Sequence, residues 1–413
     1  MLISPMLRHL VRRGTLRVIG PDGRVHVFSG EPGPTVTIRF HDKAVERQLL
    51  FNSRLYLGET YMNGRMTVED ASLYDFLDFI GYNMSVAPRS VFTPLLEGFG
   101  RGLRFFLQYN PVKRSRHNVA HHYDLSDTLY DLFLDRDRQY SCAYFSEAGM
   151  SLDQAQADKK RHLAAKLLLK PGQRVLDIGS GWGGLALYLA KECDVDVTGL
   201  TLSTEQHRVA ERRAAAAGLS NRVRFKLVDY REETGRYDRI VSVGMFEHVG
   251  VPQYRTFFAK MKALLTDDGV ALLHSIGRAD GPGSTNAWIR KYIFPGGYSP
   301  ALSEVVPVVE RTGLFITDIE VLRLHYAETL RAWRTRFLAE RDRVKALYDE
   351  RFCRMWEFYL AGSEIAFRYQ GHIVFQMQLA RQVDTVPLTR DYMFDFERRA
   401  ETPKAAKAAG KAA

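Results

Sequence analysis

The chain has 413 residues, of which 46% are apolar and 26% are charged, and its formal net charge is +10. This composition is typical of a globular protein and excludes a fibrous or wholly disordered chain. The length predicts roughly two to three domains. The positive charge favours a polyanionic partner, either a nucleic acid or an anionic membrane surface, and a merely solvated basic surface is the simpler alternative.

The sequence predicts neither a membrane span nor a secretion signal. It has no run of about 18 apolar residues, which is the length that a transmembrane helix needs. The N-terminal stretch MLISPMLRHLVRRGTLRV is broken by Arg8 and Arg12 and has no small-residue cleavage site. Cys142, Cys193 and Cys353 are far apart and form no CxxC pair. We therefore expect neither a disulfide framework nor a zinc site, and a reducing cytoplasm fits.

The N-terminal part of the sequence predicts a small mixed unit. Residues 14–40 alternate apolar and polar side chains around a PDG turn at Pro21–Gly23, which indicates a β-hairpin or meander. Residues 68–82, VEDASLYDFLDFIGY, form the clearest amphipathic run that follows, with Asp70 or Ser72 as its helix cap.

The rest of the chain divides into segments that differ in composition and in predicted secondary structure. Residues 98–117 are rich in Gly, Arg and Phe and read as a linker with amphipathic character. From about 160 to 325, short apolar strands, glycine loops and helices alternate, which is typical of a parallel α/β sheet. The segment 327–382 reads as strongly helical, and the final Ala/Lys/Gly-rich residues 401–413 read as a disordered tail.

A glycine-rich turn marks the first candidate ligand site. The segment RVLDIGSGWGGLALYLA (174–190) places an apolar strand before the turn and a helix after it. Gly179 and Gly181 let the backbone approach a ligand and leave amide groups at the helix start. Similar loops bind NAD(P). Asp177, however, lies inside the strand before the glycines, where an acid can hold water or the amino group of S-adenosylmethionine.

The next two strands also favour S-adenosylmethionine over NAD. The strand at 195–203 ends in Thr201, with Gln206 just beyond, instead of the acid that usually binds a ribose. The strand at 223–230 ends in Asp229, which is placed to accept a hydrogen bond from an adenine amino group. These features favour a methyltransferase, and a nucleotide-binding fold with another ligand remains the alternative.

Further titratable groups follow later strands. Glu247 and His248 end one apolar strand, His274 ends another, and Tyr326 is a further polar group within reach of the same sheet edge. Ligands of open α/β sheets bind at the carboxyl ends of the strands, so we expect these groups near the glycine loop. A structural hydrogen bond is the alternative for each. Adding His121 and His122 gives no spacing of a known metal motif, so we expect no metal.

At these residues the chain resembles the cyclopropane-fatty-acyl-phospholipid synthase family, of the full-length bacterial type and related to the mycolic acid methyltransferases. The matching segments, in family order, are HHYDLSDTLYDLFLD (121–135), YSCAYF (140–145), LDIGSGWGG (176–184), GLTLSTEQ (199–206), FEHVG (246–250), HSIG (274–277), YIFPGG (292–297) and HYAETLRAW (325–333). Upstream, GETYMNG (58–64) and the PDG hairpin resemble the N-terminal domain that the shorter mycolic acid enzymes lack.

The resemblance implies an α/β fold with a Rossmann-like S-adenosylmethionine-dependent methyltransferase domain and a smaller α+β N-terminal domain. The implied division is a lipid-synthase-specific domain at 1–100, a linker or amphipathic segment at 101–120, a catalytic domain with helical lipid-binding insertions at 121–395, and a disordered Ala/Lys tail at 396–413.

It also implies the site residues. The cofactor would be touched by Tyr140, Ser141, Gly179, Gly181, Thr201, Gln206, Asp229 and Tyr230, to which the loop itself adds Asp177. A bicarbonate ion would be held by Glu247, His274 and Tyr326 and by the backbone at Cys142 and Ile276. The reaction implied is transfer of a methylene group to the cis double bond of an unsaturated phospholipid acyl chain, which forms a cyclopropane ring with bicarbonate as the base. Many members have a cysteine where this chain has Ser363, which argues against an obligatory thiol there.

The implied partner is unsaturated phospholipid in the bilayer, so the expected location is cytoplasmic and peripheral on the inner face of the membrane. The basic, aromatic segment at 100–109 could bind that surface or pack internally as a linker. Full-length relatives suggest a homodimer. The alternatives are a methyltransferase that leaves a methyl branch without ring closure, a small-molecule N-methyltransferase, and a non-catalytic nucleic-acid-binding protein suggested only by charge. No nucleic-acid-binding motif is present, so no nucleic acid is expected.

Overall fold

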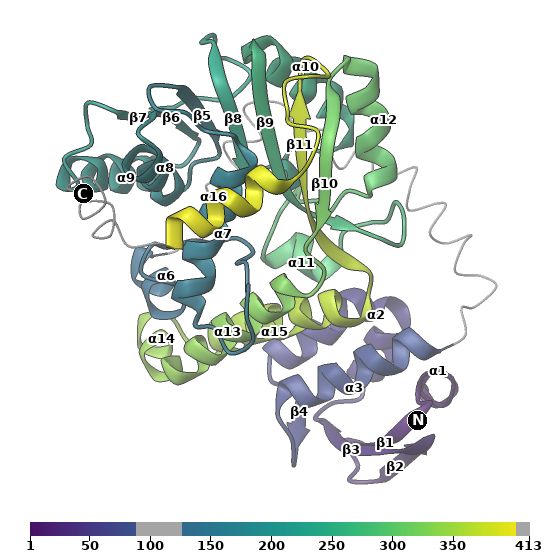
Figure 1. Cartoon of the computed structure of the whole chain (residues 1–413). Coiled ribbons are helices and arrows are strands. Elements are labelled where there is room, and N and C mark those ends of the chain that lie inside the picture. The colour runs from purple at the N-terminus through teal and green to yellow at the C-terminus, as the bar shows by residue number, and fades with distance from the viewer. Residues whose placement is uncertain (88–125, 402–413) are drawn as a thin grey trace.

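The computed structural model describes residues 1–87 and 126–401. They form a four-stranded N-terminal sheet with its helices and a larger seven-stranded sheet covered by helices. Figure 1 shows the small unit below the large one, with α13 and α15 between them. The expected α/β fold is confirmed. The segment 101–120, His121 and His122 lie outside the described residues, so the expectations for them stay untested.

The N-terminal unit combines a hairpin with a parallel strand pair. Its elements are α1 (Ser4–Leu10), β1 (Arg13–Ile19), β2 (Val25–Ser29), β3 (Glu31–Phe40), α2 (Ala44–Met62), β4 (Met66–Glu69) and α3 (Leu73–Val86). The predicted hairpin is β1–β2, which is antiparallel. The third strand does not continue a meander, because β3 pairs with β1 in parallel and carries β4 on its other edge.

Helix α3 begins later than the amphipathic pattern indicates. Val68 and Glu69 belong to β4, and Asp70 has a positive φ of 52°. Ser72 is the cap: its hydroxyl accepts the Asp75 N–H while the Asp75 carboxylate accepts the Ser72 N–H. This reciprocal pair satisfies two amide groups that the first turn of a helix leaves without partners.

The large sheet has the strand order β10-β11-β9-β8-β5-β6-β7. Its strands are β5 (Arg174–Ile178), β6 (Asp196–Thr201), β7 (Val223–Leu227), β8 (Tyr237–Val243), β9 (Leu265–Arg278), β10 (Phe315–Val321) and β11 (His372–Ala380). The five strands β5 to β9 are parallel, and β11 is antiparallel to both of its neighbours. The chain order reverses between β5 and β8, which is where ligands bind in open sheets of this kind.

Helices cover the large sheet and build the region between the two sheets. They are α6 (Asp127–Phe133), α7 (Leu152–Lys166), α8 (Gly184–Cys193), α9 (Thr204–Ala216), η1 (Phe246–His248), η2 (Val251–Gln253), α10 (Tyr254–Leu264), α11 (Ala287–Tyr292), α12 (Leu302–Thr312), α13 (His325–Ala339), α14 (Arg341–Leu347), α15 (Glu350–Tyr369) and α16 (Asp391–Glu401). None of the described helices combines the length and apolar character needed to cross a membrane.

Two predictions for the C-terminal part are corrected. The segment 327–382 is not helical throughout, because its last part forms the interior strand β11, whose apolar residues are buried on both faces of the sheet. The expected tail from residue 396 also begins too early, because α16 extends to Glu401. Phe396 packs against buried residues, and the Glu397 carboxylate lies 2.6 Å from Nδ1 of His162 on α7.

The N-terminal unit packs closely on the larger unit. Ala361 and Ile365 of α15 belong to the same buried cluster as the core of the small sheet. Gly58 of α2 lies against Trp288 of α11, where an added Cβ would be 2.6 Å from the indole nitrogen. Because α11 also contributes to the site described below, this contact fixes α2 relative to that site.

We expect Gly58→Ala to lower the free energy of unfolding by about 1–3 kcal/mol, because the new methyl group overlaps a buried indole. Gly362 of α15 is the matched control, because a Cβ there meets no atom within 4 Å. Gly362→Ala should be neutral or stabilising by up to about 1 kcal/mol, the helix preference of Ala over Gly. Urea unfolding of both variants measures the contrast, and equal effects would contradict this account of the contact.

Candidate active site

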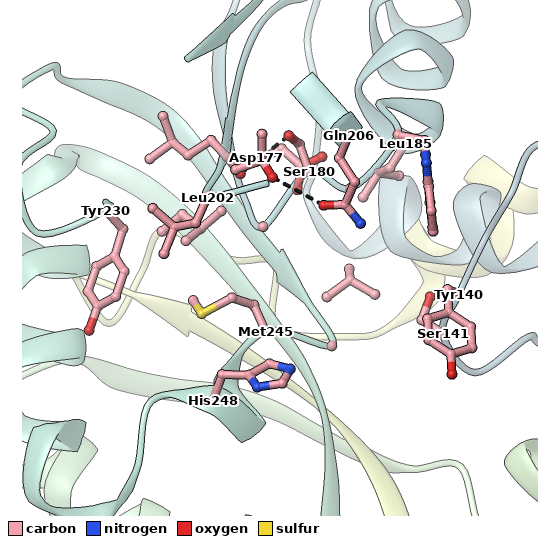
Figure 2. Close-up of a pocket in the computed structure, with 18 of the residues that line it drawn as sticks. Tyr140, Ser141, Asp177, Ser180, Leu185, Leu202, Gln206, Tyr230, Met245 and His248 are labelled. Carbon is pink, nitrogen blue, oxygen red and sulfur yellow. Dashed lines mark hydrogen bonds between the residues drawn. The ribbon is translucent and has the colours of Figure 1, made fainter. Parts of the chain in front are cut away.

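The predicted cofactor residues lie around one pocket at the reversal of strand order, which we call the glycine-loop pocket. Its lining includes Tyr140, Ser141, Asp177, Gly179, Gly181, Thr201, Gln206, Asp229 and Tyr230. Figure 2 shows Tyr140 and Ser141 on the side opposite Tyr230, with Met245 and His248 between them. The structure therefore brings this predicted set together, while the role of each residue remains a prediction.

The glycine turn leaves room for a ligand. Gly179 has a φ of +87°, and a Cβ there would lie 2.8 Å from Cβ of Met245. Gly181 has a φ of +54° and lines the pocket, with no atom within 4 Å of an added Cβ. L-residues with side chains rarely adopt such φ values. The turn thus needs glycine for its backbone and keeps an open space beside the start of α8.

Asp177 offers an acceptor inside this pocket. It is 2% exposed, and its Oδ2 is buried without a hydrogen-bond partner among the described residues. Burial raises the pKa of its carboxyl to about 7, and the positive charge of Lys159 opposes that rise. A buried acceptor left in this state costs free energy unless a donor reaches it. An amino group of the expected cofactor, or a water molecule, fits this requirement.

The polar residues after β6 and β7 have different hydrogen-bond partners. The Thr201 hydroxyl donates to Oε1 of Gln206 at 3.1 Å, so the two predicted residues support each other. Asp229 was expected to accept from an adenine amino group. In the structure its two carboxylate oxygens accept from Nε and Nη2 of Arg231, at 2.8 and 2.7 Å. Arg231 also lines the pocket and was not predicted, since nothing in a lone arginine after the strand marks it.

Residues 139–141 form a wall of this pocket, and α7 holds them in place. Lys159 is fully buried, and its ammonium donates to Oε1 of Gln139 at 2.7 Å and to Oγ of Ser141 at 2.9 Å. Gln156 donates to the Ser141 carbonyl at 2.9 Å. Burial lowers the pKa of Lys159 to about 8. Sequence reasoning missed Lys159, because α7 has no clear apolar face to show which of its lysines turns inward.

A second pocket adjoins the first and contains all five residues expected around bicarbonate. Its lining includes Cys142, Glu247, His274, Ile276 and Tyr326. Tyr140, Ser141, Gly244 and His248 line both pockets. The residues come from separate elements, namely the segment before α7, η1, β9 and α13.

Glu247 is held by a backbone amide. Its Oε1 accepts the Ile276 N–H at 2.6 Å, and its Oε2 is buried without a partner among the described residues. Burial raises the pKa of Glu247 to about 7, and the Ile276 amide opposes the rise. The backbone at Ile276 was expected to contact the ion, and this stays a prediction. In the structure the Ile276 N–H orients the Glu247 carboxylate.

The imidazole of His274 is neutral, and a neighbouring side chain fixes its orientation. It is 2% exposed, and burial lowers the pKa of its imidazole well below the usual range. Gln376 lies directly opposite on β11, with Nε2 3.2 Å from Nδ1 of His274. An amide N–H donated to Nδ1 leaves the ring proton on Nε2, from which a neutral imidazole can donate into the pocket. Gln376 was not predicted, because only the sheet register pairs it with His274.

Tyr326 and Cys142 complete the second pocket. The Tyr326 ring packs on Trp333 and Phe367, with ring centroids 5.7 and 4.8 Å apart. Cys142 is 1% exposed, its thiol donates to the Ala143 carbonyl at 3.3 Å, and burial raises its pKa. A thiol that stays protonated is a poor nucleophile. Cys142 therefore offers its backbone position to the site, not its sulfur.

The second pocket fits a small oxyanion that also carries a proton. It combines the acceptor of Glu247, which has an orphaned oxygen, with a neutral donor from His274. All three cysteines are free thiols. Among residues 1–87 and 126–401, no cluster of three or more His, Cys, Asp or Glu side chains is suited to a metal ion.

Comparison with known proteins identifies the family. A family model described as mycolic acid cyclopropane synthetase matches residues 111–377. The cyclopropane-fatty-acyl-phospholipid synthase of Escherichia coli strain K12 is 38% identical over 84% of this chain and 88% of its own length. The tuberculostearic acid methyltransferase UfaA1 of Mycobacterium tuberculosis is 36% identical over 92% of this chain and 91% of its own.

A solved structure gives the same result. The mycolic acid cyclopropane synthase CmaA1, complexed with SAH and CTAB, superposes with a TM-score of 0.62 at 34% identity. The match covers 66% of this chain and 99% of CmaA1. Together with the glycine-loop pocket, these matches show that the chain belongs to the mycolic acid cyclopropane synthetase family and is an S-adenosylmethionine-dependent methyltransferase.

Proposed function

We propose that this enzyme adds a methylene group to the cis double bond of unsaturated acyl chains in membrane phospholipids and closes a cyclopropane ring. The observation that carries the proposal is the second pocket, in which Glu247, His274 and Tyr326 adjoin the glycine-loop pocket. The name of the Escherichia coli relative supports the same substrate and product.

The glycine-loop pocket would hold S-adenosylmethionine, which supplies an electrophilic methyl group. Asp177 and Gln206 would bind its polar parts, and the 139–141 wall would fix the distance to the acyl chain. An alkene is a weak nucleophile, so the reaction requires an aligned pair of reactants and exclusion of water. Tyr140 is partly buried and packs against aromatic neighbours, among them Trp333, whose ring centroid lies 5.1 Å away. Its face suits the positive charge that methyl transfer leaves on the acyl chain.

Ring closure then requires loss of a proton from the newly added methyl group. Bicarbonate in the second pocket would supply the base for this proton and a negative charge near the cationic chain. Glu247, when ionised, would accept the O–H of the ion, while His274 and Tyr326 would donate to its oxygens. The bond to the Ile276 amide keeps Glu247 oriented for this role. The new carbon–carbon bond forms as the proton leaves, so the acyl chain gains one CH2 overall.

A second candidate function is methyl transfer without ring closure. UfaA1, at 36% identity, is named as a tuberculostearic acid methyltransferase, so similarity of this order is compatible with that product class as well. The two functions share the cofactor and the first chemical step. They differ in whether the cationic chain loses the proton that closes the ring. Pocket residues able to hold a base favour ring closure.

The proposed partner is a phospholipid bilayer that the enzyme contacts peripherally from the cytoplasmic side. A net charge of +10 suits an anionic lipid surface.

Analysis of the product tests the proposal. Purified full-length protein is incubated with S-adenosylmethionine, bicarbonate and vesicles of unsaturated phospholipid, and the acyl chains are examined by mass spectrometry and NMR. We expect a gain of one CH2, loss of alkene protons and new cyclopropyl signals. A gain of CH2 with an alkene retained would instead establish the methyl-branching function, and an unchanged lipid would reject both.

Glu247→Gln should reduce turnover about 10²- to 10⁴-fold, because the neutral amide lacks the negative charge of the carboxylate and is a weaker acceptor for the O–H of the ion. Cys142→Ser keeps the backbone amide and should cost less than about tenfold, which corresponds to about 1.4 kcal/mol of barrier. Initial rates at saturating S-adenosylmethionine provide the comparison. Similar losses in the two variants would refute the separate roles assigned to the carboxylate and the thiol.

Glu247→Gln should also change how stability depends on pH. In the wild type the neutral carboxyl is favoured in the native state, since burial raises its pKa from 4.5 to about 7. The contribution of this carboxyl to the free energy of unfolding is present at low pH and is lost as the pH rises from about 4.5 to about 7. Gln stays neutral, so the variant should gain about 2–3 kcal/mol relative to wild type between about pH 5 and pH 8. Urea unfolding at both pH values measures the gain, and a difference independent of pH would contradict it.

A further inference from the structure

Helix α2 contains a kink that exposes two large apolar side chains. Asn52, with φ −155° and ψ 81°, interrupts the helix, and its Oδ1 accepts the Leu55 N–H as a cap for the second half. Directly before the break, Leu50 is 49% exposed and Phe51 is 85% exposed. Among the described residues, no other aromatic side chain is as exposed as Phe51.

Basic side chains border this kink. Arg47 and Arg54 are exposed on either side of it, and neither pairs with a carboxylate among the described residues. On the neighbouring helix α11, Arg290 and Lys291 are also exposed. Lys291 donates to Glu59 of α2, which ties the two helices together. Exposed Leu and Phe flanked by arginines form the kind of surface that binds the boundary of an anionic bilayer.

The kink also lies beside a wall of the second pocket. Helix α11 presents Ile289 to that pocket and Trp288 to Gly58 of α2. Arg54 reaches Ser284, next to Thr285 of the pocket lining, with 3.5 Å between Nη1 and Oγ. Figure 1 shows α2 on the side of the molecule near α11 and α15, away from the C-terminal helix α16.

We infer that the kink of α2, with Leu50 and Phe51 between Arg47 and Arg54, docks the enzyme on an anionic phospholipid bilayer. The inference rests on the proposed function, since an acyl chain must leave the bilayer to reach the buried second pocket. A docking surface on the element that packs against the pocket wall shortens this path. The apolar pair enters the acyl boundary, and the arginines contact the headgroup phosphates.

Fluorescence quenching by lipid tests this surface directly. The four tryptophans of the chain, Trp182, Trp288, Trp333 and Trp356, are at most 4% exposed, so lipid at the protein surface should not quench them. Wild type gives the background quenching from an acyl chain that enters the second pocket. Full-length Phe51→Trp is mixed with vesicles of phosphatidylcholine and phosphatidylglycerol that carry brominated acyl chains. We expect quenching above the wild-type level in this variant and no such increase in Val27→Trp, a control on β2 at a site 58% exposed. Equal quenching of both variants, or of neither, would overturn the assignment.

A second experiment separates docking from catalysis. The double variant Leu50→Ser, Phe51→Ser should bind the same vesicles about ten- to a hundredfold more weakly, because it loses two apolar side chains from the interface. Val27→Ser should bind as wild type. Turnover on vesicles should fall with binding, while turnover on detergent-dispersed phospholipid stays unchanged. Vesicle binding of the double variant equal to wild type would reject the docking surface even if the enzyme is active on dispersed lipid.

Two further results show whether lipid or a second copy of the chain covers the kink of α2. Binding by wild type without any methyl transfer would leave the docking surface standing and reject the proposed function. Sedimentation analysis of the same proteins without lipid identifies the competing occupant. A wild-type dimer that the double variant cannot form would show that a second copy of the chain covers the kink, and would overturn the inference.

Discussion

The reversal of strand order between β5 and β8 is the constraint on which the site depends. At that point the chains leaving the two strands turn to opposite sides, so the sheet edge opens and backbone amides and carbonyls become available. The glycine turn follows β5, and Glu247 follows β8. Neighbouring strand β9 adds His274, which places the second pocket beside the first. One topological feature therefore fixes both pockets and their common wall.

The same edge concentrates buried polar groups that the fold leaves unsatisfied. Oδ2 of Asp177, Oε2 of Glu247 and Oε1 of Gln376 are all buried without partners among the described residues. Each such atom costs about 1–3 kcal/mol in a folded protein. The raised pKa values of Asp177 and Glu247 have the same origin, since burial disfavours their charged forms. This cost is consistent with a site organised for ligands that donate hydrogen bonds to these oxygens.

The local sequence pattern was sufficient to predict some residues of this site but not all of them. The strand–turn–helix at 174–190 was predicted, because a few adjacent residues define it. Glu247 and His274 were predicted as strand ends, but Glu247 lies in η1 after β8, and His274 lies inside β9, which continues to Arg278. Lys159 and Gln376 were not predicted, since their partners are 18 and 102 residues away in the chain. The strand β11 was read as helix because a strand buried on both faces lacks the alternation that marks a half-buried one.

The segment 139–145 shows why residue type alone misleads. A cysteine among aromatics suggests a thiolate, yet Cys142 is buried and its raised pKa keeps the sulfur protonated. What the segment contributes is position. Lys159 and Gln156 hold the Ser141 side chain and carbonyl, so the wall that both pockets share is set by α7. Because a shift of this wall would move both pockets together, the hydrogen bonds that matter most here come from a helix outside the reacting groups.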